Sequence, residues 1–406
     1  MLFFVLGFIS SVSHATSPTR DATVWRRRTD GYQAFRIPGI ARTPNGTILA
    51  FAEGRVRVDR PPVLCVGWPN TSCCVGILAN CCDNRCRDKD IVVKSSHDGG
   101  RSWVASRRLT QSSRTHVYTN PTAVADATTG KVWLMYQRCN NTAPIVYAAC
   151  TNVLRYATGN GAIWSEEIFP PQAELNCTDP ITRCQQVKGP GAGVQLQEKA
   201  GGHLGRLILQ GWHNLISDDH GVTWVASRTP TGCGECGAAE LANGNVMLAG
   251  PDPPNHFNPW VHVSTDGGNS FPPYQHDRRN NHHDTTITDD DMELSILAPG
   301  DRTHVYMAHA NRPDITGDKP HNNMHDRQNC TISKARVLNA TAAAAAPGGD
   351  GLGPWQDEVR IFDGPSGYTS MLDLGDGECG VIYERGELGE LPIQFESMNF
   401  AVFPCV

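Results

Sequence analysis

The stretch SHDGGRSW, Ser96–Trp103, decides the fold because it recurs along the chain. SDDHGVTW (Ser217–Trp224) and STDGGNSF (Ser264–Phe271) share its S-x-D-x-G-x-x-aromatic pattern. A fourth copy, ATGNGAIW (Ala157–Trp164), keeps the Gly and the Trp but lacks the Asp. Each copy follows a short β-rich run. An Asp that bonds nearby backbone N–H groups, followed by a Gly at positive φ, is typical of a β-hairpin tip, and the aromatic residue is expected to pack between sheets.

The near-regular spacing of these repeats predicts a propeller. Repeats that each carry several strands indicate a propeller or an array, and roughly 60 residues per blade leave room for six blades. No long segment has helical periodicity, so we expect almost no helix. The fold class predicted is all-β, a six-bladed β-propeller formed by residues 16–406 as a single domain. The Ala/Gly-rich segment near 341–353 is expected to be an inserted surface loop.

Composition and N-terminal sequence indicate the secretory pathway. Residues 1–15, MLFFVLGFISSVSHA, are apolar and end in Ser-His-Ala, as expected of a signal peptide. No other segment approaches a membrane span, and a net charge of -6 gives no reason to expect a nucleic acid partner. Six N-x-S/T sequons and 15 cysteines favour a secreted protein or one in the lumen of the secretory or lysosomal pathway.

The segment CGEC, Cys233–Cys236, places Glu235 between two cysteines. A CxxC pair is found in zinc sites, which need a second ligand pair, and in disulfide frameworks. The secretory features favour a disulfide here, and no metal site is predicted. We therefore expect the cysteines to support Glu235.

The order of several motifs resembles that of the sialidase (neuraminidase) family. FRIPGIARTPNGTILAFAEGR (Phe35–Arg55) resembles its first blade, and GPGAGVQLQ (Gly189–Gln197) with GRLILQGWHN (Gly205–Asn214) its central blades. GYTSMLDLGDGECGVIYERGE (Gly367–Glu387) resembles the final strand pair of the active site. The resemblance extends almost end to end, and the family fold is a six-bladed β-propeller with Asp-box (BNR) repeats.

The resemblance implies an exo-α-sialidase that releases terminal sialic acids from glycans, glycoproteins or glycolipids, with no cofactor. The substrate carries a carboxylate on its anomeric carbon, so an anionic nucleophile would be repelled. A neutral tyrosine avoids this repulsion if a base removes its proton, and sialidases are an exception to the two-carboxylate scheme of glycosidases. The expected mechanism retains the anomeric configuration.

Arginines are expected to bind the substrate carboxylate, because a guanidinium contacts a carboxylate through two parallel hydrogen bonds. Arg36 in FRIP and Arg327 in HDRQNCTIS match two family arginines. Glu384 in IYE is expected to orient Arg36, and Glu53 and Arg55 in FAEGR to line the pocket.

The resemblance assigns Tyr368, in SGYTSML, as nucleophile and Glu235 as the base that deprotonates it. Glu240, in the same motif as Glu235, is the alternative base.

The acid/base is expected on the loop CCDNRCRDKD before the strand DIVVKSS. Asp83 is the prediction and Asp88 the alternative, whereas Asp90 begins the strand and is expected to be structural. The acid must keep its proton near working pH, which partial burial favours.

One family arginine is missing. It should follow NVMLA, around Gly250 or Pro251, but the chain has no Arg between Arg228 and Arg278. His256, Arg278 or Arg279 are candidates to replace it, and an Arg introduced at Gly250 or Pro251 is expected to lower KM if the clamp is incomplete. The missing arginine leaves weakened activity, an altered substrate or a sialoglycan-binding propeller without turnover as alternatives. A trans-sialidase would use the same residues and differ only in its acceptor site. Another hairpin-repeat glycosidase that uses two carboxylates is a further alternative, but it gives no role to FRIP or GYTS.

Overall fold

The computed structural model describes residues 16–57, 88–142, 150–170, 189–199, 201–229, 231, 233–251, 259–272, 294–311, 327–338, 351–387 and 393–405. Within these ranges the regular structure is strand, which confirms the prediction of an all-β fold. No helix there is long and apolar enough to span a membrane. Residues 1–15, Asp83 and most of the Ala/Gly-rich segment lie outside these ranges.

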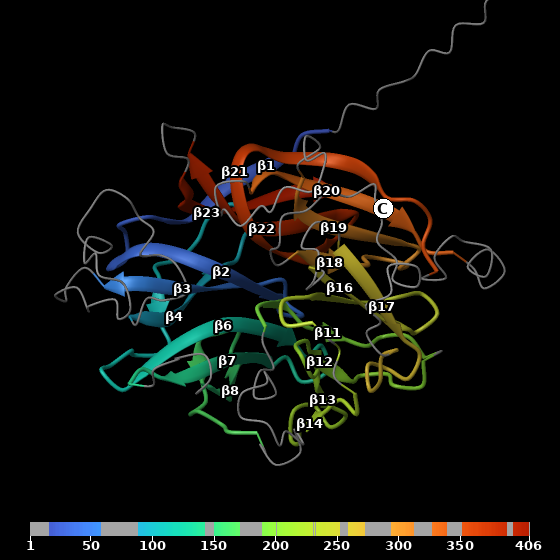
Figure 1. Ribbon diagram of the computed structural model, residues 1–406, viewed down its shortest axis with the longest axis horizontal. Helices are drawn as coiled ribbons and strands as arrows, with labels where there is room; N and C mark the ends of the chain where they lie inside the picture. The colour runs from blue at the N-terminus through green and yellow to red at the C-terminus, as the bar shows by residue number, and fades with distance from the viewer. Residues whose placement is uncertain are drawn as a thin grey trace, which may run out of the picture.

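The strands form five sheets that follow one another around the molecule in chain order (Figure 1). The first sheet contains β2 (Tyr32–Arg42), β3 (Ile48–Arg57), β4 (Lys89–Ser96) and β5 (Arg107–Arg108). The second contains β10 (Gly191–Ala192), β6 (His116–Ala125), β7 (Val132–Asn140), β8 (Cys150–Thr158) and β9 (Ile163–Trp164). The third contains β11 (Val194–Gln195), β12 (Leu207–Leu209), β13 (Leu215–Ser217) and β14 (Val225–Ala226), and the fourth β15 (Gly237–Glu240), β16 (Val246–Pro251) and β17 (Pro259–Ser264).

The fifth sheet has seven strands and joins the two ends of the chain. Its order is β18 (Ser295–Leu297), β19 (His304–Ala310), β20 (Gln328–Arg336), β21 (Gln356–Gly375), β22 (Glu378–Glu387), β23 (Ile393–Pro404) and β1 (Arg20–Arg26). The first half of β21 pairs with β20 and the second half with β22. Because β1 pairs with β23, the N-terminal strand completes the sheet that contains the C-terminal strand, as Figure 1 shows.

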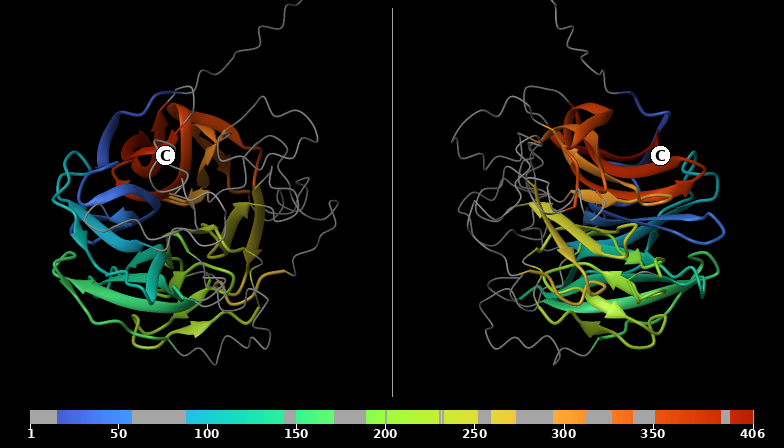
Figure 2. Two further views of the ribbon diagram at one scale, coloured as in Figure 1. Left: turned by 60° about the vertical axis from the view of Figure 1, so that its left-hand side comes forward. Right: turned by 90° about the vertical axis from the view of Figure 1, so that its right-hand side faces the viewer.

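The repeats form the hairpin tips predicted from the sequence. Asp98 accepts hydrogen bonds from the backbone N–H groups of Arg101 and Ser102 at 3.0 and 2.9 Å. The aromatic residue of a repeat packs against the preceding sheet: Trp103 contacts Phe400 of β23, with ring centroids 5.6 Å apart. Trp164 contacts Phe51 and Trp224 contacts Trp133 in the same way. The repeats therefore join neighbouring sheets in a propeller-like arrangement (Figure 2). The number of six blades remains a prediction.

A cavity of about 390 Å³ lies among the strands nearest the centre. Its lining includes residues from seven strands, among them Ile40, Ala123, Ala192, Val194, Ala238, Ile296 and Met371. Arg36, Tyr368 and Glu235 are not among the residues that line it. The candidate site is therefore separate from this cavity.

Candidate active site

Two site residues, Arg36 and Tyr368, lie at irregularities in strand pairing, and a third, Glu235, lies just before a strand. The register of β2 shifts between Arg36 and Gly39, and that of β21 shifts between Ser366 and Thr369, on either side of Tyr368. Glu235 directly precedes the cysteine before β15. β-bulges re-aim side chains and are common next to active sites. Here they accompany the contacts that Tyr368 of β21 makes with Arg36 of β2 and with Glu235, which precedes β15.

Tyr368 and Glu235 form the central contact, although 133 residues separate them in sequence. The phenol of Tyr368 donates a hydrogen bond of 2.6 Å to Oε2 of Glu235. Burial, together with the negative charge of Glu235, raises the pKa of Tyr368 well above its usual range. The phenol is therefore protonated at neutral pH and needs a proton acceptor before it can act as a nucleophile, and Glu235 is already in contact with that proton.

Two arginines lie over the ring of Tyr368. The guanidinium carbons of Arg36 and Arg327 are 5.3 and 5.4 Å from the ring centroid. Their positive charges oppose the rise in the pKa of Tyr368 that burial and Glu235 cause. Cations beside a phenol also stabilise the phenolate that forms when the proton leaves. The two arginines thus place positive charge beside the ring of Tyr368.

Glu384 fixes Arg36 and the neighbouring backbone. It is fully buried and accepts hydrogen bonds from Nε and Nη2 of Arg36 at 3.1 and 3.2 Å. It also accepts the N–H groups of Ile37 at 2.8 Å and Tyr368 at 3.2 Å. Ile37 has a φ of 60°, which is unusual for a β-branched residue, so Glu384 supports a strained turn of the chain.

Gly367 leaves room for this carboxylate. A Cβ on Gly367 would lie 2.2 Å from Oε2 of Glu384. Only glycine fits at that position without displacing Glu384. The contact with Glu384 thus explains why a glycine precedes Tyr368 in the sequence motif.

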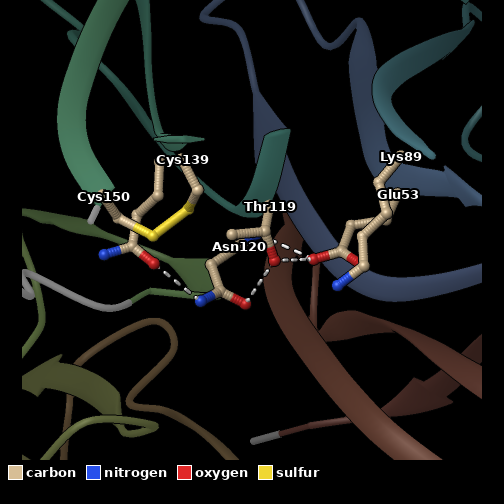
Figure 3. Close-up of a disulfide and its surroundings, with 7 residues drawn as sticks. Glu53, Lys89, Thr119, Asn120, Cys139 and Cys150 are labelled. Carbon is tan, nitrogen blue, oxygen red and sulfur yellow. Dashed lines mark hydrogen bonds and ion pairs between the residues drawn. A yellow bond between two sulfur atoms is a disulfide. The ribbon is translucent and has the colours of Figure 1, made fainter. Parts of the chain in front are cut away.

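Glu53 organises a second buried ionic cluster (Figure 3). It lies 2.6 Å from Nη2 of Arg55 and 3.8 Å from Nζ of Lys89, and all three side chains are buried. The hydroxyl of Thr119 and the N–H of Asn120 donate to the other carboxylate oxygen. Burial alone would raise the pKa of Glu53, but these cations and donors lower it to about 2. Glu53 is therefore ionised at any pH near neutrality.

Sequence reasoning did not identify Lys89, Thr119 and Asn120. Asn120 has a φ of 57° and lies at a register shift in β6, between Thr119 and Thr122. Its side chain donates to Gln137 at 3.1 Å. The Asn-Pro dipeptide at 120–121, within a β-rich run, was the available signal for an irregular strand. Nothing in the sequence connected it to Glu53.

Glu240, the alternative base, lies elsewhere. Its carboxylate accepts hydrogen bonds from the N–H groups of Gln197 and Glu198 at 2.7 and 3.0 Å, and Arg302 lies 3.5 Å away. Glu240 and Arg302 also line the cavity among the central strands. Glu240 therefore links neighbouring sheets, whereas Glu235 contacts Tyr368.

Of the three aspartates considered for the acid/base, the structure describes Asp88 and Asp90. Asp83 lies outside the described residues. Asp88 is buried and accepts a hydrogen bond of 2.6 Å from the hydroxyl of Ser112. Asp90 accepts from the phenol of Tyr32 at 2.7 Å and from the N–H of Ser112, and burial raises its pKa. The contacts of Asp90 connect β4 to its neighbours, which is a structural arrangement.

A disulfide occupies the region where the family arginine is missing. Cys233 and Cys236 are bonded, which confirms the disulfide interpretation of CGEC. A Cβ on Gly250 would lie 2.5 Å from Sγ of Cys233, so a larger residue at Gly250 would displace the disulfide. An Arg at Gly250 is therefore expected to disturb the disulfide, and it is no longer expected to lower KM. His256, Arg278 and Arg279 lie outside the described residues.

Among the residues that the structure describes, no group of three or more His, Cys, Asp or Glu side chains is placed to hold an ion.

Comparison with known proteins places the chain in context. Residues 83–332 match the family model described as a BNR repeat-like domain. The sialidase of Micromonospora viridifaciens is 29% identical over 398 residues, which cover 92% of this chain and 52% of that protein. The chain thus spans about half the length of this curated relative.

Solved structures show the same fold at low sequence identity. The intramolecular trans-sialidase of Ruminococcus gnavus superposes with a TM-score of 0.65 at 14% identity, covering 94% of this chain and 97% of that chain. The sialidase of Trypanosoma rangeli has a TM-score of 0.60 at 16% identity, covering 96% of this chain and 59% of that chain. At such identities the similarity concerns the fold alone.

Proposed function

Because the chain belongs to the family of BNR repeat-like domains and is similar to a sialidase, we propose that it is an exo-α-sialidase that hydrolyses terminal sialic acids from glycoconjugates. The observation that carries this proposal is the 2.6 Å hydrogen bond from the phenol of Tyr368 to Glu235, with Arg36 and Arg327 over the tyrosine ring. A neutral nucleophile, a base that touches its proton and cations for a carboxylate are the groups that cleavage of a sialoside requires.

In the proposed mechanism, Arg36 and Arg327 bind the carboxylate of the sialic acid and place its anomeric carbon next to Tyr368. The phenolic oxygen attacks this carbon while its proton passes to Glu235. The bond to the leaving glycan breaks, and Asp83 gives its proton to the departing oxygen. Water then attacks the sialyl–tyrosine bond and loses a proton to Asp83, and Tyr368 recovers its own proton from Glu235. Two inversions retain the anomeric configuration.

The remaining buried groups position this machinery. Glu384 holds Arg36 through two hydrogen bonds and also holds the backbone on both sides of the clamp. Glu53 holds Arg55 through one carboxylate oxygen, which lies 2.8 Å from Nε and 2.6 Å from Nη2, and we propose that Arg55 lines the substrate pocket. Preorganised charges of this kind cost no reorganisation during the reaction.

We also propose that the propeller has six blades. The seven-stranded sheet counts as two of them if it is divided within β21, whose two halves pair with different neighbours. The central cavity is lined by β2, β6, β11 and β15 from the first four sheets and by β18 and β21 from the seven-stranded sheet, in support of this division.

The sequon and cysteine content supports a location in the secretory pathway, with residues 1–15 removed. Mass spectrometry of the N-terminus of the purified, cell-expressed protein tests this, and a mature chain that begins at Thr16 is the expected result.

A second candidate function is a sialoglycan-binding propeller without turnover. It is favoured by Gly250, which excludes an arginine side chain from a position next to the disulfide. Loss of one charge-assisted contact weakens binding of a carboxylate by about 1.5–3 kcal/mol. The proposal of an enzyme is preferred because Tyr368 and Glu235 are in contact, and a binding protein has no need of that pair.

Release of a fluorophore from an aryl sialoside tests the proposed function. The unmodified protein should release it with retention of configuration, whereas Tyr368→Phe and Glu235→Ala should lose most activity. General-base assistance is worth roughly 10²–10⁴-fold. No release by the unmodified protein between about pH 4 and 8, with binding of the sialoside intact, would favour the binding function. Transfer to an added glycan acceptor in preference to water would identify a trans-sialidase.

A further inference from the structure

The carboxylates of the site are held in two different ways. Glu384 accepts four hydrogen bonds, and Glu53 is held by Arg55, Lys89, Thr119 and the N–H of Asn120. Among the described residues, by contrast, the carboxylate of Glu235 accepts a single hydrogen bond, from Tyr368. That contact must change during a reaction in which the proton moves. The position of Glu235 therefore has to come from its backbone.

The backbone of Glu235 lies inside a small disulfide ring. Cys233 and Cys236 are both buried and are separated by three positions, so the bond closes a ring that contains Gly234 and Glu235. The ring packs against β16, where a Cβ on Gly250 would lie 2.5 Å from Sγ of Cys233 and 3.1 Å from the carbonyl oxygen of Glu235. The fit against Gly250 leaves the ring no space to shift towards β16.

Thr231 attaches this ring to the preceding sheet. Its buried hydroxyl donates to the carbonyl oxygen of Gly211 at 2.7 Å and accepts the N–H of Cys233 at 3.1 Å. The N–H of Thr231 donates to the carbonyl oxygen of Trp212 at 2.7 Å. The ring is thus anchored on one side through Thr231 and packed on the other against Gly250.

We propose that the Cys233–Cys236 disulfide, anchored through Thr231, is the element that positions Glu235 against Tyr368. This inference rests on the proposed function and assigns the cysteines and Thr231 as positioning residues for the base. Without the bond, Gly234 gives the segment additional backbone freedom, and the base would spend less time in contact with the phenol. A displacement of about 1 Å can lower a rate by roughly 100-fold. Binding of the substrate carboxylate by Arg36 and Arg327 should be unaffected.

The test compares two disulfide deletions in the full chain. Cys233→Ala/Cys236→Ala removes the proposed positioning element. Cys379→Ala/Cys405→Ala is the matched control, because it also removes a buried disulfide and its bridge spans 26 positions instead of three. In the chain-entropy model the control loses at least as much stability, since a longer loop is released. In the pairing of β22 with β21, Cys379 lies opposite Asp373, which is near the end of β21 and five residues beyond Tyr368.

The expected result is a split between kcat and KM on an aryl sialoside. The Cys233/Cys236 variant should lose roughly 10- to 100-fold in kcat. Its KM, and its affinity for a non-hydrolysable sialic acid analogue, should stay within about threefold of the unmodified protein. The control should keep kcat and lose only thermal stability. A full kcat in the Cys233/Cys236 variant, or an equal loss of kcat in both variants, would overturn the inference.

A second variant keeps the inference testable if the first does not fold. Thr231→Val preserves the disulfide and the side-chain volume but removes the anchor, and it should lower kcat in the same selective way, by several-fold. An unchanged kcat in that variant would refute the positioning role. Failure of the proposed function is seen separately, because the unmodified protein with its disulfides intact would then release no product.

Discussion

Replacement of Glu384 by Gln should damage stability and activity together. The carboxylate of Glu384 is fully buried and accepts four hydrogen bonds, two from Arg36 and one each from the N–H groups of Ile37 and Tyr368. A glutamine has nearly the same volume, so no cavity forms. Its carbonyl oxygen can replace Oε1, but its amide nitrogen would face Nη2 of Arg36 and the N–H of Tyr368. The amide nitrogen is itself a donor, so it cannot accept the hydrogen bonds from these two groups.

The size of the effect follows from the burial of Arg36, which is 2% exposed. Removing one partner of a buried ion pair costs about 3–5 kcal/mol, because the remaining charge is left without compensation. The same change should weaken one arm of the carboxylate clamp by about 1.5–3 kcal/mol, which corresponds to a loss of roughly 10- to 150-fold in kcat/KM.

Two assays measure these effects on the same preparation. Urea unfolding gives the free energy of unfolding, and aryl sialoside hydrolysis gives kcat/KM. Glu240→Gln is the matched control, since Glu240 is also buried and accepts two backbone N–H groups. The control should lose stability but keep kcat/KM within about threefold, because Glu240 has no contact with the clamp. A Glu384→Gln protein with unchanged kcat/KM would refute the role assigned to this carboxylate.

Three further predictions concern Gly250, Glu53 and the acid. Gly250→Arg should destabilise the protein by about 1–3 kcal/mol or more and should not lower KM, because its Cβ overlaps Sγ of Cys233; a lower KM at full stability would contradict the packing. Glu53 has a pKa lowered to about 2, so its contribution to stability, about 3 kcal/mol, is present above pH 4.5 and is lost as the pH falls towards 2. The stability gap between the unmodified protein and Glu53→Gln, measured by thermal unfolding, should therefore close over that interval and remain constant above it. Asp83→Ala should lower activity on natural glycans by roughly 10²-fold or more and less on an aryl sialoside, which has a better leaving group; if Asp88→Ala shows that pattern instead, the acid is Asp88.

The repeats allowed most of the fold to be predicted, because their chemistry is local. The Asp98 carboxylate bonds to N–H groups three and four residues away, so the motif and the turn are the same segment. The pairing of β1 with β23 joins the two ends of the described chain and has no local signal. The division of β21 between two neighbours is likewise a property of the tertiary structure.

The candidate site was predictable as a set of residue types but not as a set of contacts. Family motifs pointed to Tyr368, Glu235 and Arg36, and the structure brings these three together. The support of Glu53 by Asn120 was not predictable, because it depends on a register shift in another sheet. The exclusion of a side chain at Gly250 was not predictable either, because it depends on how the disulfide packs against β16.

The most direct test of the central claim is to trap the sialyl–enzyme intermediate with a fluorinated sialosyl fluoride and to map the label by peptide mass spectrometry. A fluorine next to the anomeric centre slows hydrolysis of the intermediate, so the adduct accumulates. The account predicts one sialyl group on the peptide that contains Tyr368, no label in Tyr368→Phe, and slower labelling in Glu235→Gln. A label on an aspartate or glutamate, or turnover of the reagent by Tyr368→Phe at the rate of the unmodified protein, would contradict it.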